Sequence, residues 1–439
     1  MNIANPDKSP PSWAAATLMR VLAVEREEIG AMLTAFVFVI CVWTSYMVLR
    51  PVRDAMGITS GVSKLPLLFW GTFIAMLLVQ PAFGWIISRY RRTVALPWIY
   101  GFFVGNLLLF YGWFYLQPDH TWIARAFFVW LSVFNLFVLS LFWSICVDVF
   151  TAEQARRLFG FIAGGTSIGG IIGPALTAQL AVPLGRINLL LVAAGFLALS
   201  IFFMQRLIRW QRTQQREVGQ QADVDRKVGG NPFSGLYEVF GNPYLFGLAI
   251  FVFLLTWLNT FLYLQQAELV SKAVLDPDRQ TALFGSIDFW VQTITLLIQV
   301  LALGRLTSRL GIALLMLIVP ILMVFGFSWL ALNPTLWVLI AVVIVRRVGE
   351  YAIMRPCREM LFTTVPREAK YKAKNFIDTV VYRGGDAISG SAYAGLGWLG
   401  LTTVGIAWVG ALLAALWGVA SYAIARKHVA AAAANSTRT

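Results

Sequence analysis

The chain has 439 residues, 59% of them hydrophobic and only 13% charged, and a formal net charge of +14. Ordinary soluble domains carry about 25% charged residues, so this composition excludes a soluble multidomain protein and predicts an all-α polytopic membrane protein. The positive charge could indicate nucleic acid binding, but lysine and arginine also gather on the cytoplasmic loops of membrane proteins. We assign most of the charge to topology and expect no nucleic acid partner.

Residues that serve soluble-enzyme chemistry are scarce. The three cysteines, Cys41, Cys146 and Cys357, lie in or beside apolar runs and offer neither a disulfide framework nor a CxxC metal site. The two histidines, His120 and His428, lie far apart in the chain and cannot form an HExxH motif, and the absence of a GK dipeptide excludes a Walker A loop. We therefore expect no enzymatic activity, no metal and no cofactor.

The chain opens with a polar, proline-bearing segment that does not resemble a cleavable signal. Residues 12–28 (SWAAATLMRVLAVEREE) predict a short interfacial helix within a cytoplasmic N-terminus at 1–28. A transmembrane helix needs about 20 apolar residues. Apolar runs of this kind predict twelve spans, at 29–50, 65–88, 95–116, 121–147, 158–182, 187–208, 242–270, 282–304, 311–332, 335–357, 376–400 and 402–425.

Arginine and lysine gather in the turns after even-numbered spans, which places those turns and both termini in the cytoplasm. The first outer turn breaks this rule, because it carries Arg50, Arg53 and Lys64. A polar stretch at 209–241 predicts a cytoplasmic linker between two six-helix bundles, 29–208 and 242–426, and residues 427–439 are expected to form a disordered tail.

The two halves share short sequence patterns. GWIISR at 84–89 returns as GRLTSR at 304–309, and the glycine pair at 164–165 has a counterpart at 384–385. Such a 6+6 pseudo-repeat is typical of secondary transporters, in which substrate binds near the bilayer midplane between two halves that rock against each other.

Span ten contains the strongest cluster of charge within the predicted membrane. Glu350 follows Arg346 by four residues and Arg347 by three, so either arginine can pair with it on one helical face. We interpret the cluster as a substrate or gating site. The alternative is a structural ion pair that fixes two helices, or arginines that snorkel to the inner interface.

Spans eight and eleven supply candidates for carrying a coupling proton. Asp378, Tyr382 and Asp386 are spaced to share one helical face, and Arg383 can reach Asp386. Burial favours the neutral form of a carboxylate, so these residues could bind a proton, or they could be paired with span ten. Asp288 is a further proton-site candidate, with a structural hydrogen bond as the alternative.

The charges at the end of span one follow helical spacing. Tyr46, Arg50 and Arg53 stand at i, i+4 and i+7, which predicts a tyrosine and two guanidiniums on one face of a helix that bends or ends at Pro51. If this face lines a cavity, the exception to the charge rule is explained, and the planar guanidiniums suit phosphate or carboxylate. The alternative is outer-surface charge paired with Asp54.

Several segments together resemble the ATP/ADP antiporter (nucleotide translocase) family in its compact bacterial branch. They are LRPVRDAMG at 49–57, FWS at 142–144, QARRLFG at 154–160, EYA at 350–352 and KAKNFIDT at 372–379, so the resemblance runs over nearly the whole chain. It implies a major-facilitator-like fold that exchanges nucleotides or related phosphorylated anions across the bacterial inner membrane.

The same resemblance implies a coupling or gating role for Glu153 and a substrate-binding role for Lys64. Glu153 matches an acidic position that the family keeps at the start of span five, and Lys64 lies close to a family lysine before span two. The chain departs from the family in span seven, which is neutral at 261–264, and in span eleven, where Asp386 stands in place of a lysine.

We therefore expect a monomeric secondary transporter for an organic anion, most naturally a nucleotide or another phosphorylated metabolite, by exchange or proton coupling. Its partners would be this small anion, protons and membrane lipid. Two alternatives remain open: a lipid-handling protein of the flippase or scramblase kind, and a proton-coupled exporter of drugs or metabolites. A lipid-accessible lateral groove between spans five and eight or two and eleven would favour the lipid-handling alternative.

Overall fold

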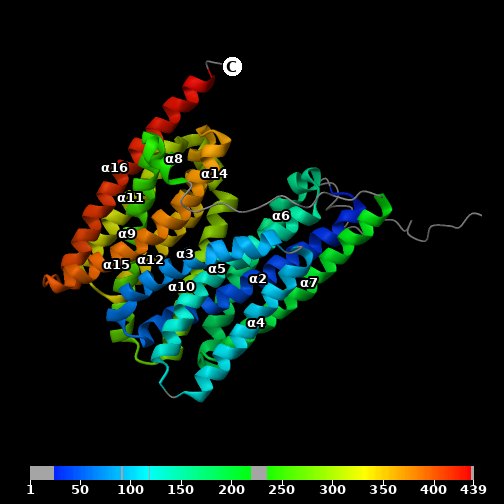
Figure 1. The fold of residues 1–439 in the computed structure, drawn as a ribbon. Coiled ribbons are helices and arrows are strands. Elements are labelled where there is room, and N and C mark those ends of the chain that lie inside the picture. The colour runs from blue at the N-terminus through cyan, green and yellow to red at the C-terminus, as the bar shows by residue number, and fades with distance from the viewer. Residues whose placement is uncertain (1–23, 90–91, 118, 219–234, 437–439) are drawn as a thin grey trace, which may run out of the picture.

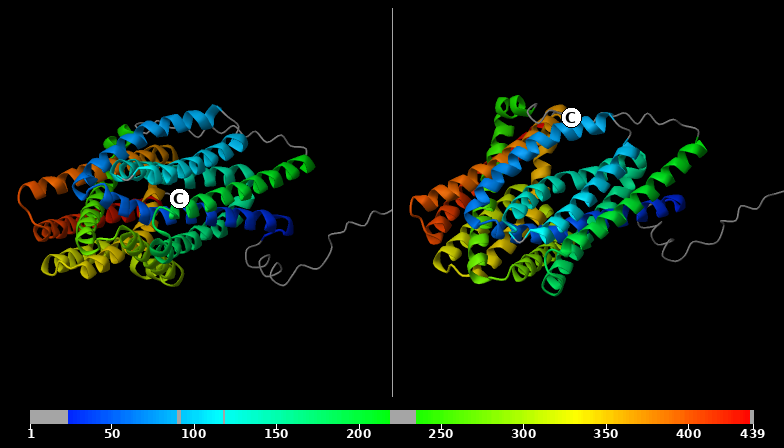
Figure 2. Two further views of the ribbon diagram at one scale, coloured as in Figure 1. Left: turned by 90° about the horizontal axis from the view of Figure 1, so that it is seen from below. Right: turned by 60° about the horizontal axis from the view of Figure 1, so that its bottom comes forward.

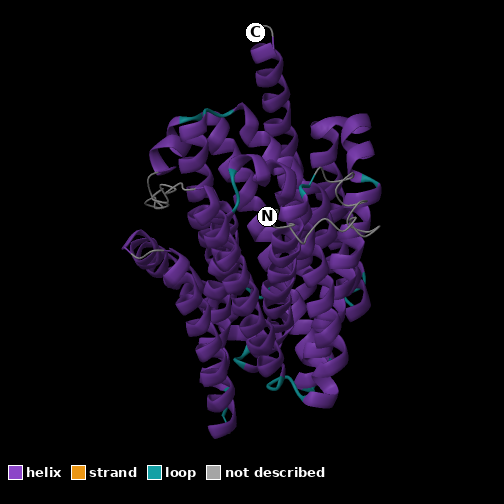
Figure 3. Cartoon of the chain, turned by 90° about the vertical axis from the view of Figure 1, so that its right-hand side faces the viewer, coloured by secondary structure: helices purple, strands orange, loops and turns teal. Residues whose placement is uncertain are grey.

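The structure is a computed structural model of the chain, and it describes residues 24–89, 92–117, 119–218 and 235–436. Every regular element in these residues is helical (Figure 3). The elements are α2 (Arg26–Thr59), η1 (Val62–Lys64), α3 (Leu65–Arg89), α4 (Arg92–Leu116), α5 (Thr121–Val149), α6 (Ala152–Leu184), α7 (Leu189–Val218), α8 (Leu236–Gly241), α9 (Pro243–Ala273), α10 (Pro277–Leu301), α11 (Leu303–Leu332), α12 (Leu336–Gly349), η3 (Glu350–Met354), α13 (Arg355–Leu361), η4 (Phe362–Thr364), α14 (Arg367–Phe376), η5 (Ile377–Val381), α15 (Tyr382–Trp398) and α16 (Thr403–Ser436).

The predicted twelve-span fold is confirmed. Ten helices of the described chain are long and apolar enough to cross a membrane. The other two spans are interrupted by π-helical turns: span ten runs through α12, η3 and α13, and span eleven through α14, η5 and α15. A π-helical turn accommodates one extra residue and is often found at functional sites.

The spans form two halves, which we call the N-terminal half (α2 to α7) and the C-terminal half (α8 to α16). Each half has its own hydrophobic core: one extends from Val24 to Ile208, and the other gathers residues from Val239 to Ala425. The halves meet where α2 and α6 pack on α10, and where α3 packs on α15 (Figures 1 and 2).

Small residues bring the helices into close contact. In α6, Gly165, Gly169 and Gly173 repeat every four residues and face α2; a Cβ atom on Gly173 would lie 2.6 Å from the Cβ of Met47. Close approach of backbones through small residues is a common source of helix association in membranes, where hydrophobic driving force between helices is weak. The glycine spacing thus fixes α6 against α2 within the N-terminal half.

The bundle has two different ends. We call the end that carries the start of α2, the end of α7, α8 and α14 the linker end, and the opposite end, with the connections after α2, α4 and α6, the loop end. At the loop end the halves are joined through Arg186. Its backbone N–H donates to Asp278 Oδ1 of the C-terminal half at 2.9 Å, while its guanidinium donates to Thr59 Oγ1 at 2.8 Å.

Several expected boundaries differ from the structure. Helix α2 does not end at Pro51 but continues to Thr59, because Val52 and Met56 beyond the proline pack into the N-terminal core. The tail expected to be disordered from residue 427 is helical as far as Ser436, since its alanine run has high helix propensity.

The polar linker expected at 209–241 is partly helical, because α7 continues to Val218 and α8 begins at Leu236. Its centre, 219–234, lies outside the described residues, as does most of the interfacial helix expected at 12–28.

Candidate functional site

A cavity of about 910 Å³ lies between the two halves. Residues of α2, α3, α5, α6 and α9 line it together with residues of α10, span ten and α15. Its charged lining consists of six arginines and four carboxylates: Arg50, Arg53, Arg346, Arg347, Arg355, Arg383, Asp54, Glu350, Glu359 and Asp386.

The cavity is displaced toward the linker end. Its lining includes Gln299 and Glu359, each two residues from the linker end of its helix, and stops at Asp54, five residues before the loop end of α2. Beyond Asp54 the halves are closed by the Arg186 contacts and by apolar packing of Leu65 and Phe128 with Leu264 and Ala267 of α9. The geometry is that of a transporter open toward the linker end.

The predicted face of α2 points into this cavity. Tyr46, Arg50 and Arg53 all line it, as their helical spacing indicated. Arg53 is firmly paired, because its Nε and Nη2 donate to Asp54 Oδ1 at 3.1 and 2.7 Å, and Tyr263 donates to the same oxygen at 3.2 Å. Both arginine side chains are largely buried, with exposed fractions of 17% for Arg50 and 16% for Arg53.

Span ten contributes two arginines with different partners. Arg346 Nη1 pairs with Glu350 Oε2 at 2.8 Å, one turn along the helix, and also contacts Asn259 of α9. Arg347 pairs instead with Asp288 of α10. The predicted pairing of Glu350 with a neighbouring arginine therefore forms through Arg346, and Arg347 is directed to a different carboxylate.

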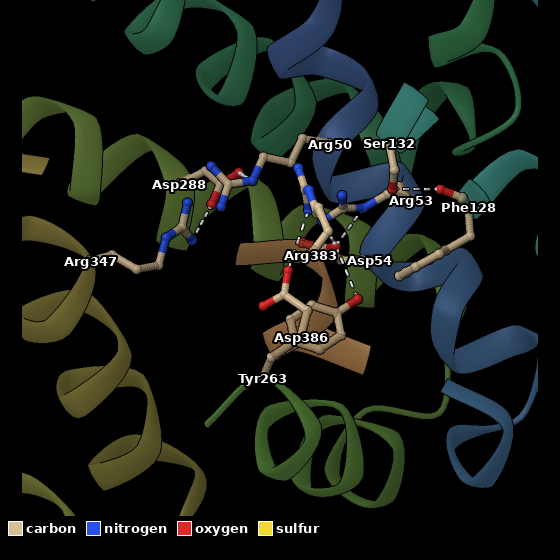
Figure 4. Close-up of polar contacts among 10 residues, drawn as sticks. All are labelled: Arg50, Arg53, Asp54, Phe128, Ser132, Tyr263, Asp288, Arg347, Arg383 and Asp386. Carbon is tan, nitrogen blue, oxygen red and sulfur yellow. Dashed lines mark hydrogen bonds and ion pairs between the residues drawn. The ribbon is translucent and has the colours of Figure 1, made fainter. Parts of the chain in front are cut away.

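Asp288 lies between arginines of both halves (Figure 4). Its Oδ1 pairs with Arg347 of the C-terminal half, while its Oδ2 lies 3.6 Å from Nε of Arg50 in the N-terminal half. Only 2% of its side chain is exposed, and it does not itself line the cavity. Asp288 therefore bridges the two halves of the molecule.

Span eleven places its charged residues on two sides. Asp386 lines the cavity, 3.5 Å from Arg383 Nη1, and accepts a hydrogen bond from Thr260 at 3.3 Å. Tyr382 also lines the cavity. The expectation that Asp378 shares this face is wrong, because Asp378 lies within the π-helical turn η5, whose extra residue shifts the register before Tyr382 and Asp386. Asp378 instead pairs with Arg358 at 3.3 Å.

Lys64 and Glu153, the two residues inferred from the family resemblance, lie away from the cavity lining. Lys64 ends the short helix η1 at the loop end, and Glu153 lies in the first turn of α6 at the linker end. Both side chains are exposed. Their separation from the lining follows from their positions at helix termini, which sequence similarity alone does not locate relative to a cavity.

Sequence reasoning missed two groups of lining residues. In α9, Asn259, Tyr263 and Gln266 line the cavity with the same i, i+4, i+7 spacing as the face of α2. This spacing of polar residues in an apolar span could have predicted a second cavity-lining face from the sequence. Arg355, near the end of the predicted span 335–357, also lines the cavity and lies 3.7 Å from Glu350. These residues are five apart, roughly 140° around a regular α-helix, and the π-helical turn η3 brings them together.

Comparison with known proteins gives the family. A model of the Major Facilitator Superfamily matches residues 31–385. The chain belongs to the major facilitator superfamily. It is thus a multi-pass membrane transporter for small molecules, and not an enzyme. No curated protein matches the sequence.

Solved structures similar to this major facilitator are transporters with low sequence identity. The nucleoside transporter NupG is 17% identical, with a TM-score of 0.64 over 91% of this chain and 99% of that one. A bacterial homologue of the iron transporter ferroportin, in an inward-facing state, is 12% identical, with a TM-score of 0.62 over 90% and 100%.

A POT family transporter in complex with a thioalcohol conjugated peptide is 13% identical, with a TM-score of 0.60 over 90% of this chain and 96% of that one. These neighbours are named for nucleosides, iron and peptides. The shared fold therefore does not choose a substrate, and the substrate must be argued from the cavity.

Proposed function

We propose that the protein is a secondary active transporter of the bacterial inner membrane that moves an organic anion by alternating access. Both termini would lie in the cytoplasm, so the cavity would open inward. The favoured cargo is a nucleotide or another phosphorylated metabolite, carried by exchange or with protons, and one chain would suffice. The observation that carries the proposal is the set of arginines contributed to one central cavity by both halves.

The charge of the cavity suits an anion. Six arginines and four carboxylates line it, and adding Asp288 behind Arg50 and Arg347 leaves an excess of one positive charge. Guanidinium groups bind phosphate and carboxylate through paired hydrogen bonds, which lysine cannot reproduce. Burying charge inside a membrane protein is costly, so such a cluster is expected where it serves transport.

The size and the aromatic lining support an anion with a ring system. The volume of about 910 Å³ is at the upper end of the range of roughly 300 to 1,000 Å³ found for small-molecule sites. Trp43, Tyr46, Trp143 and Tyr351 line the cavity beside the arginines. Aromatic faces of this kind can stack on a planar ring such as a nucleobase, which agrees with the family resemblance.

Two carboxylates are placed to couple a proton to the anion. Asp386 and Glu350 line the same cavity as the arginines they pair with, Arg383 and Arg346. An anion that binds one of these arginines would compete with its carboxylate, and release of the carboxylate would favour proton uptake. Asp378 lies on the Arg358 side of span eleven and is the weaker candidate for coupling.

The seams between the halves argue against the lipid-handling alternative. Between spans five and eight, a Cβ atom on Gly285 would lie 2.8 Å from the backbone nitrogen of Ala178. Between spans two and eleven, Trp70 Nε1 donates to Ser391 Oγ at 2.9 Å. The helices are in direct contact at both of these positions, whereas lipid transfer needs a lateral groove into which a headgroup can pass.

A thermal-shift screen of the purified protein tests the proposal. The panel contains inorganic phosphate, ATP, ADP, AMP, a hexose phosphate, a dipeptide and a short-chain phospholipid. We expect the phosphorylated anions to raise the melting temperature in wild type and to do so less in Arg50→Ala, because a ligand that binds the native state stabilises it. Stabilisation by the phospholipid or dipeptide, with none by the anions, would contradict the proposal.

A further inference from the structure

We infer that Asp288 acts as an internal counter-anion that holds Arg50 while no substrate is bound, and so keeps the empty transporter open at the linker end until an anion binds there. The inference rests on the proposed transport of an anion. In this account Asp288 is a positioning residue: it touches the arginines that bind substrate and does not line the cavity itself.

The first argument is the geometry of the bridge. Arg50 belongs to α2, and Asp288 and Arg347 belong to α10 and α12, so the contact of Asp288 with Arg50 joins the two halves (Figure 4). It lies where α2 packs on α10, with Arg50 nine residues before the loop end of α2. Opening of the loop end during alternating access must separate these helices and therefore must break this ion pair.

The second argument is that the bridge is incomplete. Among the described residues, Asp288 Oδ2 has no hydrogen-bond partner, and neither do Nε and Nη2 of Arg347. Asp288 and Arg347 are nevertheless buried, with exposed fractions of 2% and 6%. Buried donors and acceptors are normally satisfied. The free N–H groups of Arg347 can therefore donate to an incoming anion without breaking strong hydrogen bonds, and the free Oδ2 shows that Asp288 does not hold Arg50 by a hydrogen bond.

Unequal pairing of the cavity arginines adds a third argument. Arg53 makes two short hydrogen bonds to Asp54, and Arg346 lies 2.8 Å from Glu350, both within one half. Arg50 is held only at 3.6 Å, and its partner belongs to the other half. Arg50 is therefore a loosely held arginine whose partner lies in the other half, and its capture by an anion removes a link between the halves.

The consequence concerns the empty transporter. If the halves separate without substrate, Arg50 loses its counter-charge in a largely buried position, which is costly. A bound anion supplies that counter-charge and lowers the cost of the movement. The empty protein should consequently remain open at the linker end, and only a protein loaded from that end should open its loop end. Uptake of an anion from the loop-end side should therefore require an anion on the linker-end side.

The first test needs no ligand. Thr281 is fully buried in α10, one turn from Gly285, which packs on α6. We would introduce Thr281→Cys as a reporter and measure maleimide labelling of the substrate-free protein, with the unmodified chain as the background for the buried native cysteines. Asp288→Asn should raise the labelling rate roughly tenfold, the effect of losing one charged interaction. An unchanged or lower rate would overturn the inference.

A matched control removes a carboxylate whose contacts stay within one half. Glu268 pairs with Lys272 at 2.7 Å and accepts a hydrogen bond from Tyr393, all in the C-terminal half. Glu268→Gln should leave the labelling of Cys at position 281 unchanged. Asp288→Glu should stay close to wild type, because it retains the negative charge. Equal acceleration by Glu268→Gln would show a general loosening and would overturn the inference.

Loss of Asp288 alone leaves Arg347 without a counter-charge and could prevent folding. The double variant Asp288→Asn with Arg347→Gln removes both charges of that pair and still releases Arg50. The labelling rate of Cys at position 281 is measured in this double variant as well, and it should rise as in Asp288→Asn. An unchanged rate in the double variant would overturn the inference even if the single variant does not fold.

The second test measures coupling with ADP as the probe. Labelled ADP is added outside proteoliposomes in which the loop end faces outward and which contain either ADP or no ADP. Wild type should take up label only when the vesicles contain ADP, because the empty protein does not open its loop end, whereas Asp288→Asn should also take up label into ADP-free vesicles. Retained dependence on internal ADP in Asp288→Asn would overturn the inference. If wild type neither binds nor carries ADP, the nucleotide proposal fails, and the ligand-free labelling still decides the role of Asp288.

Discussion

The arginines of the cavity differ in how tightly the protein itself holds them. A guanidinium that already has two short hydrogen bonds to a carboxylate, as Arg53 has to Asp54, gains less from a ligand than one held at 3.6 Å, as Arg50 is by Asp288. Helical spacing in the sequence was enough to place both on one face. It could not rank them, because their partners depend on contacts between spans distant in the chain.

This ranking predicts unequal effects of substitution. Arg50→Ala should weaken anion binding by roughly 1.5 to 3 kcal/mol, the range for a charged hydrogen bond, and Arg53→Ala should weaken it less. Arg50→Lys should restore only part of the loss, because an ammonium group lacks the planar pair of donors. Isothermal titration with the anion found in the thermal-shift screen measures these differences. Equal affinities in wild type and Arg50→Ala would place the binding site elsewhere.

The carboxylates Glu350 and Asp386 should respond differently to neutralisation. Glu350 is 3% exposed and lies between Arg346 and Arg355, so Glu350→Gln leaves buried positive charge and should lower the free energy of unfolding by about 3 kcal/mol. Asp386 has looser contacts, at 3.5 Å to Arg383. Asp386→Asn should therefore fold normally.

Transport by Asp386→Asn should lose its response to a pH gradient, because the amide cannot take up a proton. Thermal denaturation measures the stability of both variants, and uptake at two external pH values measures the pH response of Asp386→Asn. Intact pH-dependent uptake by Asp386→Asn would remove this residue as a coupling site, and unchanged stability of Glu350→Gln would show that its ion pair is not structural.

At the scale of helices, apolar runs located all twelve spans, because the membrane imposes a length and a composition that few other constraints override. The interior of spans ten and eleven was less predictable. Reasoning with 3.6 residues per turn aligned Asp378 with Asp386, whereas the structure pairs Asp378 with Arg358 at the π-helical turn η5. A regular helix would also place Arg355 away from Glu350, and the π-helical turn η3 brings them together. Such turns leave no clear mark in a single sequence.

Close packing of α6 on α2 can be tested by substituting two glycines of α6, Gly173 and Gly164. A methyl group on Gly173 would lie 2.6 Å from Met47 Cβ and 2.9 Å from the carbonyl oxygen of Thr44, whereas nothing lies within 4 Å of one on Gly164. Gly173→Ala should therefore lower the free energy of unfolding by roughly 1 to 3 kcal/mol through overpacking. Gly164→Ala should have no cost, because alanine favours helix. Thermal denaturation of both variants makes the comparison, and equal stabilities would contradict the packing account.

At the scale of the whole molecule, the 6+6 organisation follows from sequence repeats and charge distribution, but the pairing of Arg50 with Asp288 does not. That contact joins the first and eighth spans, and it exists only because the halves face each other across one cavity. The positive charges in the first outer turn were the available hint, since Arg50 and Arg53 line the cavity and are not loop residues.

The orientation of the molecule gives a direct prediction. Basic turns fall at the linker end, so a reporter inserted within 211–228 should read cytoplasmic, and reporters at Pro118 or Asp276 should read outside. Alkaline phosphatase and fluorescent protein fusions measure this. Reversed labelling would turn the cavity outward and contradict the proposed inward-open state.

Uptake of a labelled phosphorylated anion into proteoliposomes tests the central claim most directly. Wild-type protein should take up labelled ADP with saturation when the vesicles contain ADP. Arg50→Ala should abolish most of this uptake, while the control Glu268→Gln should retain it. The account is contradicted if wild type takes up neither ADP nor any other phosphorylated anion of the screening panel, or if Arg50→Ala transports as well as wild type.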